Sequence, residues 1–220
     1  VGDIVVVKAV TTEATALASA LSLSLSGSRT ITALETYTTS TSVGTTYFTH
    51  TVATGNDATV TVSVTGPDTA GNAAVASGTT TFAIDTTAPS VALTYAIASS
   101  VPANATAAGN LTFSSSLSRP VTVGDIVVVK AVTTEATALA SALSLSLSGS
   151  RTITALETYT TSTSVGTTYF THTVATGNDG TVTVSVTGPD TAGNAAVASG
   201  TTTFAIDTTA PSVALTYAIT

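Results

Sequence analysis

The chain contains two near-identical copies of one segment. Residues 1–97 align without a gap with residues 123–219, and the copies differ only where Ala58 in the first becomes Gly180 in the second. A catalytic site would have to be duplicated whole, whereas a spacer gains length from each copy. The repeat therefore favours a structural role over catalysis, with a recent duplication of no functional meaning as the alternative.

The string AIDTTAPSVALTYAI, found at 83–97 and again at 205–219, marks the joint between copies. Gly and Pro punctuate chains between domains, and a residue before Pro prefers extended backbone, so each Ala-Pro step is expected to begin a domain. The ends of the sequence then do not coincide with these expected domain boundaries, as is expected of a segment of a longer tandem array. We expect 1–87 to be a repeat lacking its opening strands, 88–209 a complete repeat, and 210–220 the opening strand of a following repeat.

Apolar residues in the complete repeat recur with a period of two, which is typical of β-strands. The segment LSLSLS, for example, places three leucines on one face and serines on the other. A stretch with some helical propensity, 133–143, predicts at most a short turn. About seven short strands in one repeat predict an all-β fold, an antiparallel sandwich. The predicted strands are 90–97, 111–113, 125–132, 143–148, 167–175, 181–187 and 201–207.

Composition excludes several classes of function. The formal net charge is −7 with only five Lys and Arg residues, which disfavours nucleic acid as a partner. The chain contains no Cys, so disulfides and thiolate metal sites are excluded. No apolar run approaches the roughly 20 residues needed to span a bilayer, so this segment is not expected to insert into a membrane.

Four segments, in this order, carry a resemblance to a known family: LTFSSSLSRPVTVGDIVVV, GTTYFTHTVA, GTVTVSVTGPDTAGN and TTTFAIDTTAPSV. They resemble the bacterial immunoglobulin-like repeats that occur in tandem in very large surface adhesins. The resemblance covers most of 88–209, although the stretch from about 132 to 165 is longer and richer in Ala, Ser and Thr than the family's pattern. It implies tandem immunoglobulin-like sandwiches in a large protein of the cell surface. Where the family has an acidic residue before Pro, this chain has Arg119, so a metal role for that acid is lost.

Four aspartates are candidates for a calcium site between repeats. Loops of a sandwich collect at two poles, and we expect Asp125 and Asp190 at the pole where the domain begins. Asp57 and Asp85 are expected at the far pole of the preceding repeat. Stacked repeats would bring these carboxylates together, and Ca²⁺ prefers roughly six to eight oxygen ligands. The resemblance also implies calcium at the junction; the alternative is that each Asp caps a turn by accepting hydrogen bonds from its own backbone.

Two sequons point to a glycoprotein: Asn104 in NAT and Asn110 in NLT. Thr-rich tracts such as TYTTSTSVGTT are further acceptors for O-linked sugar. Sugar would cover sheet edges that otherwise invite aggregation in a chain with only 8% charged residues. The alternative is an unmodified surface whose Thr content reflects β-propensity.

Catalytic signals are weak. The sequence contains no nucleophile elbow, phosphate loop or zinc-binding spacing. His50 and His172 lie in line with phenylalanines on one strand face, so each is interpreted as a half-buried strand residue. Glu35 and Glu157 would each need a second positioned carboxylate to act as a glycosidase. The chain is therefore not expected to be an enzyme.

Three functions remain open. The first is a structural or adhesive extender in an extracellular shaft or filament, with neighbouring repeats and other copies as partners. The second is a module that binds glycan or a protein partner, for which Tyr37, Tyr47 and Phe48 are candidate stacking residues unless they pack in the core. The third is a filament subunit in which the C-terminal opening strand of one chain completes the first repeat of another.

Overall fold

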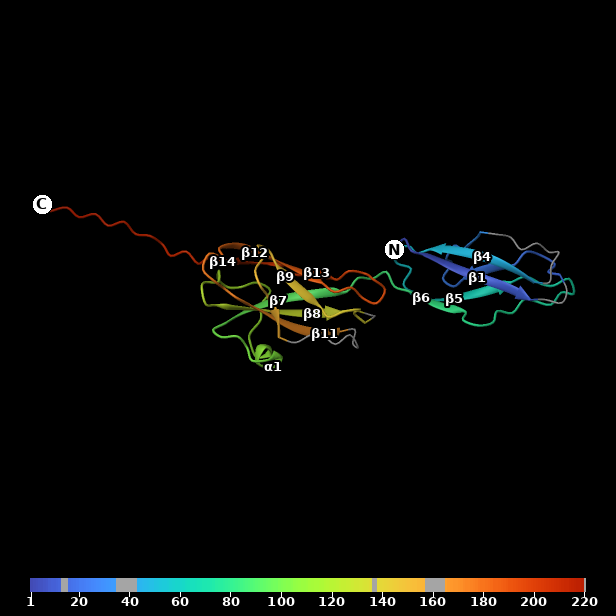
Figure 1. Ribbon diagram of the computed structural model, residues 1–220, viewed down its shortest axis with the longest axis horizontal. Helices are drawn as coiled ribbons and strands as arrows, with labels where there is room; N and C mark the ends of the chain where they lie inside the picture. The colour runs from blue at the N-terminus through green and yellow to red at the C-terminus, as the bar shows by residue number, and fades with distance from the viewer. Residues whose placement is uncertain (13–15, 35–42, 136–137, 157–164, 220) are drawn as a thin grey trace. The chain divides into compact units, whose positions relative to one another are not determined.

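The computed structural model describes residues 1–12, 16–34, 43–135, 138–156 and 165–219. In these residues the chain is nearly all β and divides into two compact units, Val1–Thr87 (unit 1) and Ala88–Thr220 (unit 2), each shown in Figure 1. The helix found in the described part, α1 (Ala105–Gly109), is only five residues long. The predicted all-β class is confirmed. Glu35, Glu157 and Tyr37 lie outside the described residues.

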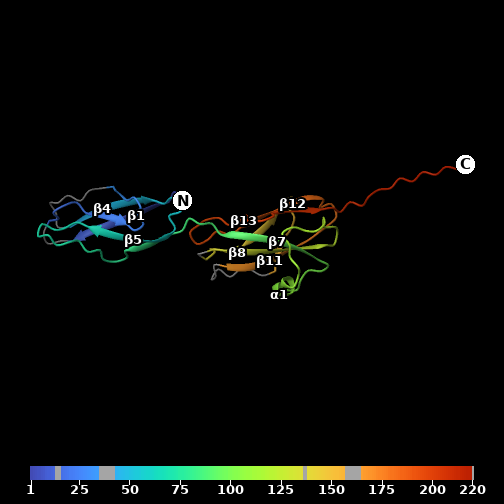
Figure 2. The same cartoon turned by 180° about the vertical axis from the view of Figure 1, so that it is seen from behind.

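Unit 2 contains a five-stranded sheet in the order β10-β11-β8-β7-β13 and a three-stranded sheet in the order β14-β12-β9. Neighbouring strands are antiparallel except for β13 and β7, which are parallel. In Figure 2, β7 and β8 are seen side by side in unit 2. The strands are β7 (Ser90–Ala98), β8 (Ile126–Thr134), β9 (Ser144–Leu147), β10 (Thr154–Ala155), β11 (Val165–Thr173), β12 (Gly180–Thr187), β13 (Val197–Ser199) and β14 (Thr203–Ile206).

The two sheets of unit 2 bury their facing side chains in one core. Alternation along each strand sends every second side chain inward, so Val91, Leu93 and Tyr95 of β7 all enter it. They meet residues of β12 and β14 from the other sheet, including Val184 and Phe204. On the outer face of the larger sheet, α1 and the residues after it cover β8. Both faces of β8 are therefore buried.

Unit 1 repeats the same strand pairs with the same registers, except where β7 would lie. Its sheets have the orders β1-β4-β3 and β2-β5-β6. β1 pairs with β4 as β8 pairs with β11, but β1 stands at the edge of its sheet in the described structure, whereas β8 lies between β11 and β7. The strands are β1 (Ile4–Thr12), β2 (Ser22–Leu25), β3 (Thr32–Ala33), β4 (Val43–Thr51), β5 (Ala58–Thr65) and β6 (Thr81–Ile84).

Six of the seven predicted strand positions are confirmed, with shifted ends. The predicted strand 111–113 is wrong: its region makes a single bridge, between Ser114 and Tyr95, and Phe113 instead packs its ring on Tyr169 at 5.8 Å. No helix forms in the described residues of 133–143. In this stretch β8 ends, and Leu139 forms an isolated antiparallel bridge with Asp190 in the loop between β12 and β13. The prediction missed α1 and the short strands β10 and β13.

Candidate functional site

The predicted carboxylates Asp125 and Asp190 lie at opposite ends of unit 2. Because β7 and β8 are antiparallel, β8 begins where β7 finishes, and Asp125 immediately precedes β8. Because β13 is parallel to β7, it begins where β7 begins, and Asp190 lies in the loop before β13. The expectation that both share the first pole is therefore wrong. Its cause is the predicted strand 111–113: without it, β8 runs in the opposite direction to the one expected.

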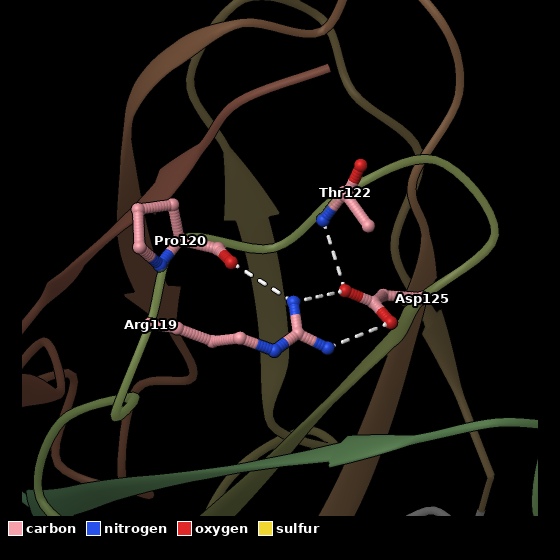
Figure 3. Close-up of polar contacts among 4 residues, drawn as sticks. All are labelled: Arg119, Pro120, Thr122 and Asp125. Carbon is pink, nitrogen blue, oxygen red and sulfur yellow. Dashed lines mark hydrogen bonds and ion pairs between the residues drawn. The ribbon is translucent and has the colours of Figure 1, made fainter. Parts of the chain in front are cut away.

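Asp125 is engaged by an arginine rather than presented to solvent (Figure 3). Nη1 of Arg119 lies 2.7 Å from Oδ2 of Asp125 and Nη2 lies 3.1 Å from Oδ1, a bidentate ion pair. The amide of Thr122 also donates to Oδ2 at 2.9 Å, and Nη1 of Arg119 donates to the carbonyl of Pro120 at 2.9 Å. The Arg119 guanidinium holds the pKa of the Asp125 carboxyl below its usual range. Through these contacts Asp125 stabilises the loop before β8.

Asp190 caps the turn that leads into β13. Its Oδ1 accepts hydrogen bonds from the amides of Ala192 (2.9 Å) and Asn194 (2.8 Å), and its Oδ2 accepts one from the Asn194 side chain (2.8 Å). Asp68 makes the same contacts in unit 1, and hydrogen bonds from Asn72 lower the pKa of the Asp68 carboxyl. These contacts are those of the turn-capping alternative.

A second acid lies beside Asp190 in the interior of unit 2. Glu135, which follows the last residue of β8, is 6% exposed, and Asp190 is 1% exposed. A carboxylate oxygen of one lies within 4.8 Å of a carboxylate oxygen of the other. Two buried carboxylates so close together repel each other when both are ionised, and a cation between them would relieve that repulsion. The pair can hold a metal ion if further oxygen ligands are supplied. Sequence analysis did not single out Glu135.

Asp57 and Asp85 are brought together at one end of unit 1, where β5 begins beside the end of β6. Oδ1 of Asp57 accepts the amide of Thr86, and Oδ2 accepts the Thr87 hydroxyl at 2.6 Å. These hydrogen bonds lower the pKa of the Asp57 carboxyl, with the Thr87 hydroxyl as the largest cause. Oδ1 of Asp85 accepts the amide of Thr87 at 3.0 Å. Both acids thus fix the Asp-Thr-Thr segment that leaves unit 1.

The sequon asparagines flank the short helix. Oδ1 of Asn104 accepts the amide of Ala107 at 2.9 Å, so Asn104 is the N-cap of α1, and Asn110 is its C-cap residue. Both side chains are exposed, and glycosylation of either one stays a prediction.

The histidines are core residues. His50 and His172 are 6% and 4% exposed, and the Nδ1 of each lies 2.8 Å from a main-chain carbonyl oxygen, of Thr30 and Thr152 respectively. Because a carbonyl only accepts, Nδ1 carries the proton in each ring. Phe48 is also buried, at 3% exposure, and Tyr47, its neighbour in β4, points to the opposite face. Tyr47 and Phe48 therefore form no common stacking surface.

Sequence analysis did not predict a groove in unit 1. The groove has a volume of about 520 Å³ and runs along β1, and its lining is both apolar (Val7, Leu21) and polar (Lys8, Asp68). In unit 2, the residues that correspond to Val7 and Ala9 are Val129 and Ala131, and each has 0% exposure. The groove lies where unit 2 places β7.

No helix in the described part of the chain is long and apolar enough to cross a membrane. Comparison of the chain with protein-family models, with curated proteins and with solved structures found no match.

Proposed function

We propose that this chain is an extender segment of a large extracellular repeat protein, in which immunoglobulin-like domains follow one another in a shaft or filament. The observation that carries the proposal is the repeat itself, two copies that differ at one aligned position. A domain whose role is to add length to a shaft needs no variation between copies. Copies that bind ligands gain from differing, because different copies can then recognise different ligands. The glycan-binding alternative also loses support, because Phe48 is buried in the core.

The topology of unit 2 suits serial linkage. The chain enters at the start of β7 and leaves after β14, whose last residue, Ile206, bridges to Val121 just before β8. Val121 lies at the end of the unit where β7 finishes, so entry and exit are at opposite ends. A nine-residue strand spans about 30 Å, and each domain would therefore add at least that length to a shaft.

Hydrogen bonds within each unit fix the segment by which the chain leaves that unit. Asp57 holds Thr86 and Thr87 at the exit of unit 1, and Asp179 holds Thr208 and Thr209 in the same way at the exit of unit 2. Proline follows each joint within two residues and fixes its own φ angle. Segments pinned in this way lose little further conformational entropy when domains are arranged in line.

We further propose calcium at this joint, with a ligand set revised from the sequence-based one. Glu135 and Asp190 replace Asp125, which is paired with Arg119. Asp85, from the sequence-based set, is kept as a proposed third ligand.

The mass of the native protein tests the extender proposal. In an extract of the source's surface proteins, peptides of this sequence should migrate in a species several times heavier than 21.5 kDa. A native species near 21.5 kDa would refute the proposal.

Calcium is tested separately by titration calorimetry and small-angle scattering of the 220-residue chain. Calcium should bind and increase the maximum dimension relative to chelator, and Glu135→Gln should weaken binding at least about 10-fold. Glu13→Gln, the same substitution in the first copy, is the matched control and should leave binding unchanged. Equal scattering with calcium and with chelator would refute the calcium joint alone.

A further inference from the structure

A polar pocket lies in unit 1 beside the turn that follows β2. Its volume is about 450 Å³, which is within the range of roughly 300–1,000 Å³ that small-molecule sites occupy. All of its lining residues fall within 27–32 and 49–56, so the pocket belongs to unit 1 alone. The polar side chains that line it include those of Arg29, Thr30, Thr49, His50, Thr51 and Asn56.

His50 brings to this pocket a buried acceptor without a partner. The His50 side chain is 6% exposed, and its Nδ1 donates to the carbonyl of Thr30 at 2.8 Å. Nε2 therefore keeps a lone pair, and it has no hydrogen-bond partner among the described residues. Buried polar atoms in folded proteins almost always have a partner, in the protein, in ordered water or in a bound group. A group that completes this site must therefore donate a hydrogen bond.

Arg29 brings an unpaired donor to the same pocket. Its Nη1 donates to the carbonyl of Ser26 at 2.6 Å, and its Nη2 donates to the carbonyl of Asn56 at 2.7 Å. These two bonds fix the guanidinium in place. The Nε–H is buried and has no partner among the described residues. The pocket thus offers one fixed donor and one fixed acceptor.

Unit 2 repeats this arrangement with its own residues. His172 is 4% exposed, and its Nδ1 donates to the carbonyl of Thr152 at 2.8 Å. Nη2 of Arg151 donates to the carbonyl of Asn178 at 2.7 Å. Nε2 of His172 and Nε of Arg151 are again buried without a partner among the residues that the structure describes. The donor and the acceptor are therefore a property of the repeat.

The turn beside the pocket has a backbone conformation that residues with a side chain rarely adopt. Ser28, which lines the pocket, has a φ of 55°, and so does Ser150 in unit 2. Every other positive φ in the described structure belongs to a glycine. Such a conformation persists only where its surroundings fix it, and it is often found at ligand sites. Here the bond from Arg29 to Ser26 spans the turn, so the donor is positioned before a ligand binds.

Hydroxyl groups match these two atoms, because a hydroxyl both donates and accepts hydrogen bonds. A carboxylate brings no hydrogen for Nε2 of His50, and the net charge of −7 on the chain repels it. A metal cation is repelled by the Arg29 guanidinium. An apolar ligand would leave both atoms unpaired. The pocket therefore suits an uncharged compound with several hydroxyl groups.

We propose that this site, in each unit, binds an uncharged polyhydroxyl ligand, either a saccharide or an open-chain polyol. Hydroxyls of the ligand donate to Nε2 of His50 and accept from Nε–H of Arg29, and the threonines of the lining pair with further hydroxyls. Both nitrogens are sheltered from bulk water, where hydrogen bonds are stronger. The described lining includes neither Tyr47 nor Phe48, so recognition here depends on hydrogen bonds and not on aromatic stacking.

This inference goes beyond the extender function and is compatible with it. A shaft of identical repeats carries one such site in each repeat, and every site takes the same ligand. A single ligand gives the copies no reason to differ.

Proton NMR of the 220-residue chain tests the proposal, because the chain contains only two histidines, one at each site. Glucose, N-acetylglucosamine and sorbitol are titrated separately while the two imidazole Hε1 signals are followed, and His50→Phe assigns the signals by removing one. At least one compound should shift both signals with a Kd of about 10 mM or tighter. Acetate, the carboxylate control, should shift neither.

The sugars and sorbitol distinguish the two sources of the ligand. Binding of a sugar without sorbitol assigns the site to a saccharide ring, and binding of sorbitol assigns it to open-chain polyols; both results support the proposal. No shift with any of the three compounds would leave the pocket to water. That result, or an equal shift with acetate, overturns the proposal.

A second variant locates the binding without disturbing the core. Thr51→Val removes an exposed hydroxyl from the pocket of unit 1 and should weaken the binding reported by the His50 signal at least about 3-fold. The His172 signal, whose site is unchanged, is the internal control. Thr45→Val changes an exposed threonine of the same strand outside the pocket lining and should leave both titrations unchanged. Equal effects of the two variants overturn the proposal, while the mass of the native protein still decides the extender function.

Discussion

The ring of Tyr95 in β7 packs against the ring of Phe204 in β14, with 6.0 Å between their centroids and 55° between their planes. The Tyr95 hydroxyl also donates a hydrogen bond to the carbonyl of Thr201 at 2.7 Å. One side chain thus ties the larger sheet of unit 2 to the smaller one. Tyr217 is the equivalent residue in the C-terminal segment 211–219, which forms no strand, and it is 89% exposed.

Replacement of Tyr95 should separate the contribution of its ring from that of its hydroxyl. Tyr95→Ala removes a buried ring and should lower the free energy of unfolding of unit 2 by about 3–5 kcal/mol. Tyr95→Phe keeps the ring and leaves the Thr201 carbonyl without this donor, for a loss of about 1 kcal/mol. Tyr217→Ala is the matched control and should leave the free energy of unfolding of unit 2 unchanged, because Tyr217 is 89% exposed. Urea unfolding measures all three, and equal effects of the Tyr95 and Tyr217 variants would contradict the assigned core.

Alkaline pH should destabilise unit 2 through the same residue. Burial raises the pKa of Tyr95 from 10.0 to about 12. In the unfolded chain the phenol ionises near pH 10, while the folded unit keeps it protonated, so the folded state binds more protons above pH 10. Stability is therefore unaffected by Tyr95 below pH 10 and falls as the pH rises towards 12. Urea midpoints measured from pH 9 to 12 should fall less steeply in Tyr95→Phe, and parallel slopes would contradict this assignment.

Alternation within the sequence predicted most strands because burial on one face needs only local pattern. Leu145 and Leu147 point inward as their spacing requires. The segment around Phe113 failed because its side chain packs under α1 beside Tyr169 rather than in a ladder. That one error reversed the expected direction of β8 and therefore placed Asp125 at the wrong end of unit 2. The groove could not be predicted from the strand sequence for a different reason. β1 and β8 are identical in sequence, and their burial differs because β8 has β7 beside it whereas β1 stands at the edge of its sheet.

The Arg119–Asp125 pair should contribute stability that is lost in acid. The pKa of Asp125 is lowered in the folded state by the Arg119 hydrogen bonds, so the pair stabilises unit 2 above the unfolded pKa of about 3.8 and loses this effect as the pH falls below it. Arg119→Ala should reduce the urea midpoint of unit 2 at pH 7, and the difference from the parent should shrink at pH 3. Asp3→Asn changes the same position in the first copy, where the side chain is exposed, and should leave unit 2 unaffected. A difference that is equal at both pH values would show that the ion pair is not the cause.

The single difference between the copies should be exchangeable, unlike other glycines. Gly180 has a φ of 121°, but its counterpart Ala58 makes the same ladder pair, with Ile84 in place of Ile206, without a positive φ. Gly180→Ala can adopt the backbone of the first copy, so its effect should stay within about 1 kcal/mol. Gly149 is the contrast: its φ of 74° is one that residues with a Cβ rarely adopt, and Nη1 of Arg151 would have to move aside for the added Cβ. Gly149→Ala should cost about 1–2 kcal/mol or more, and thermal unfolding that ranks the two variants the other way would contradict the assigned turn.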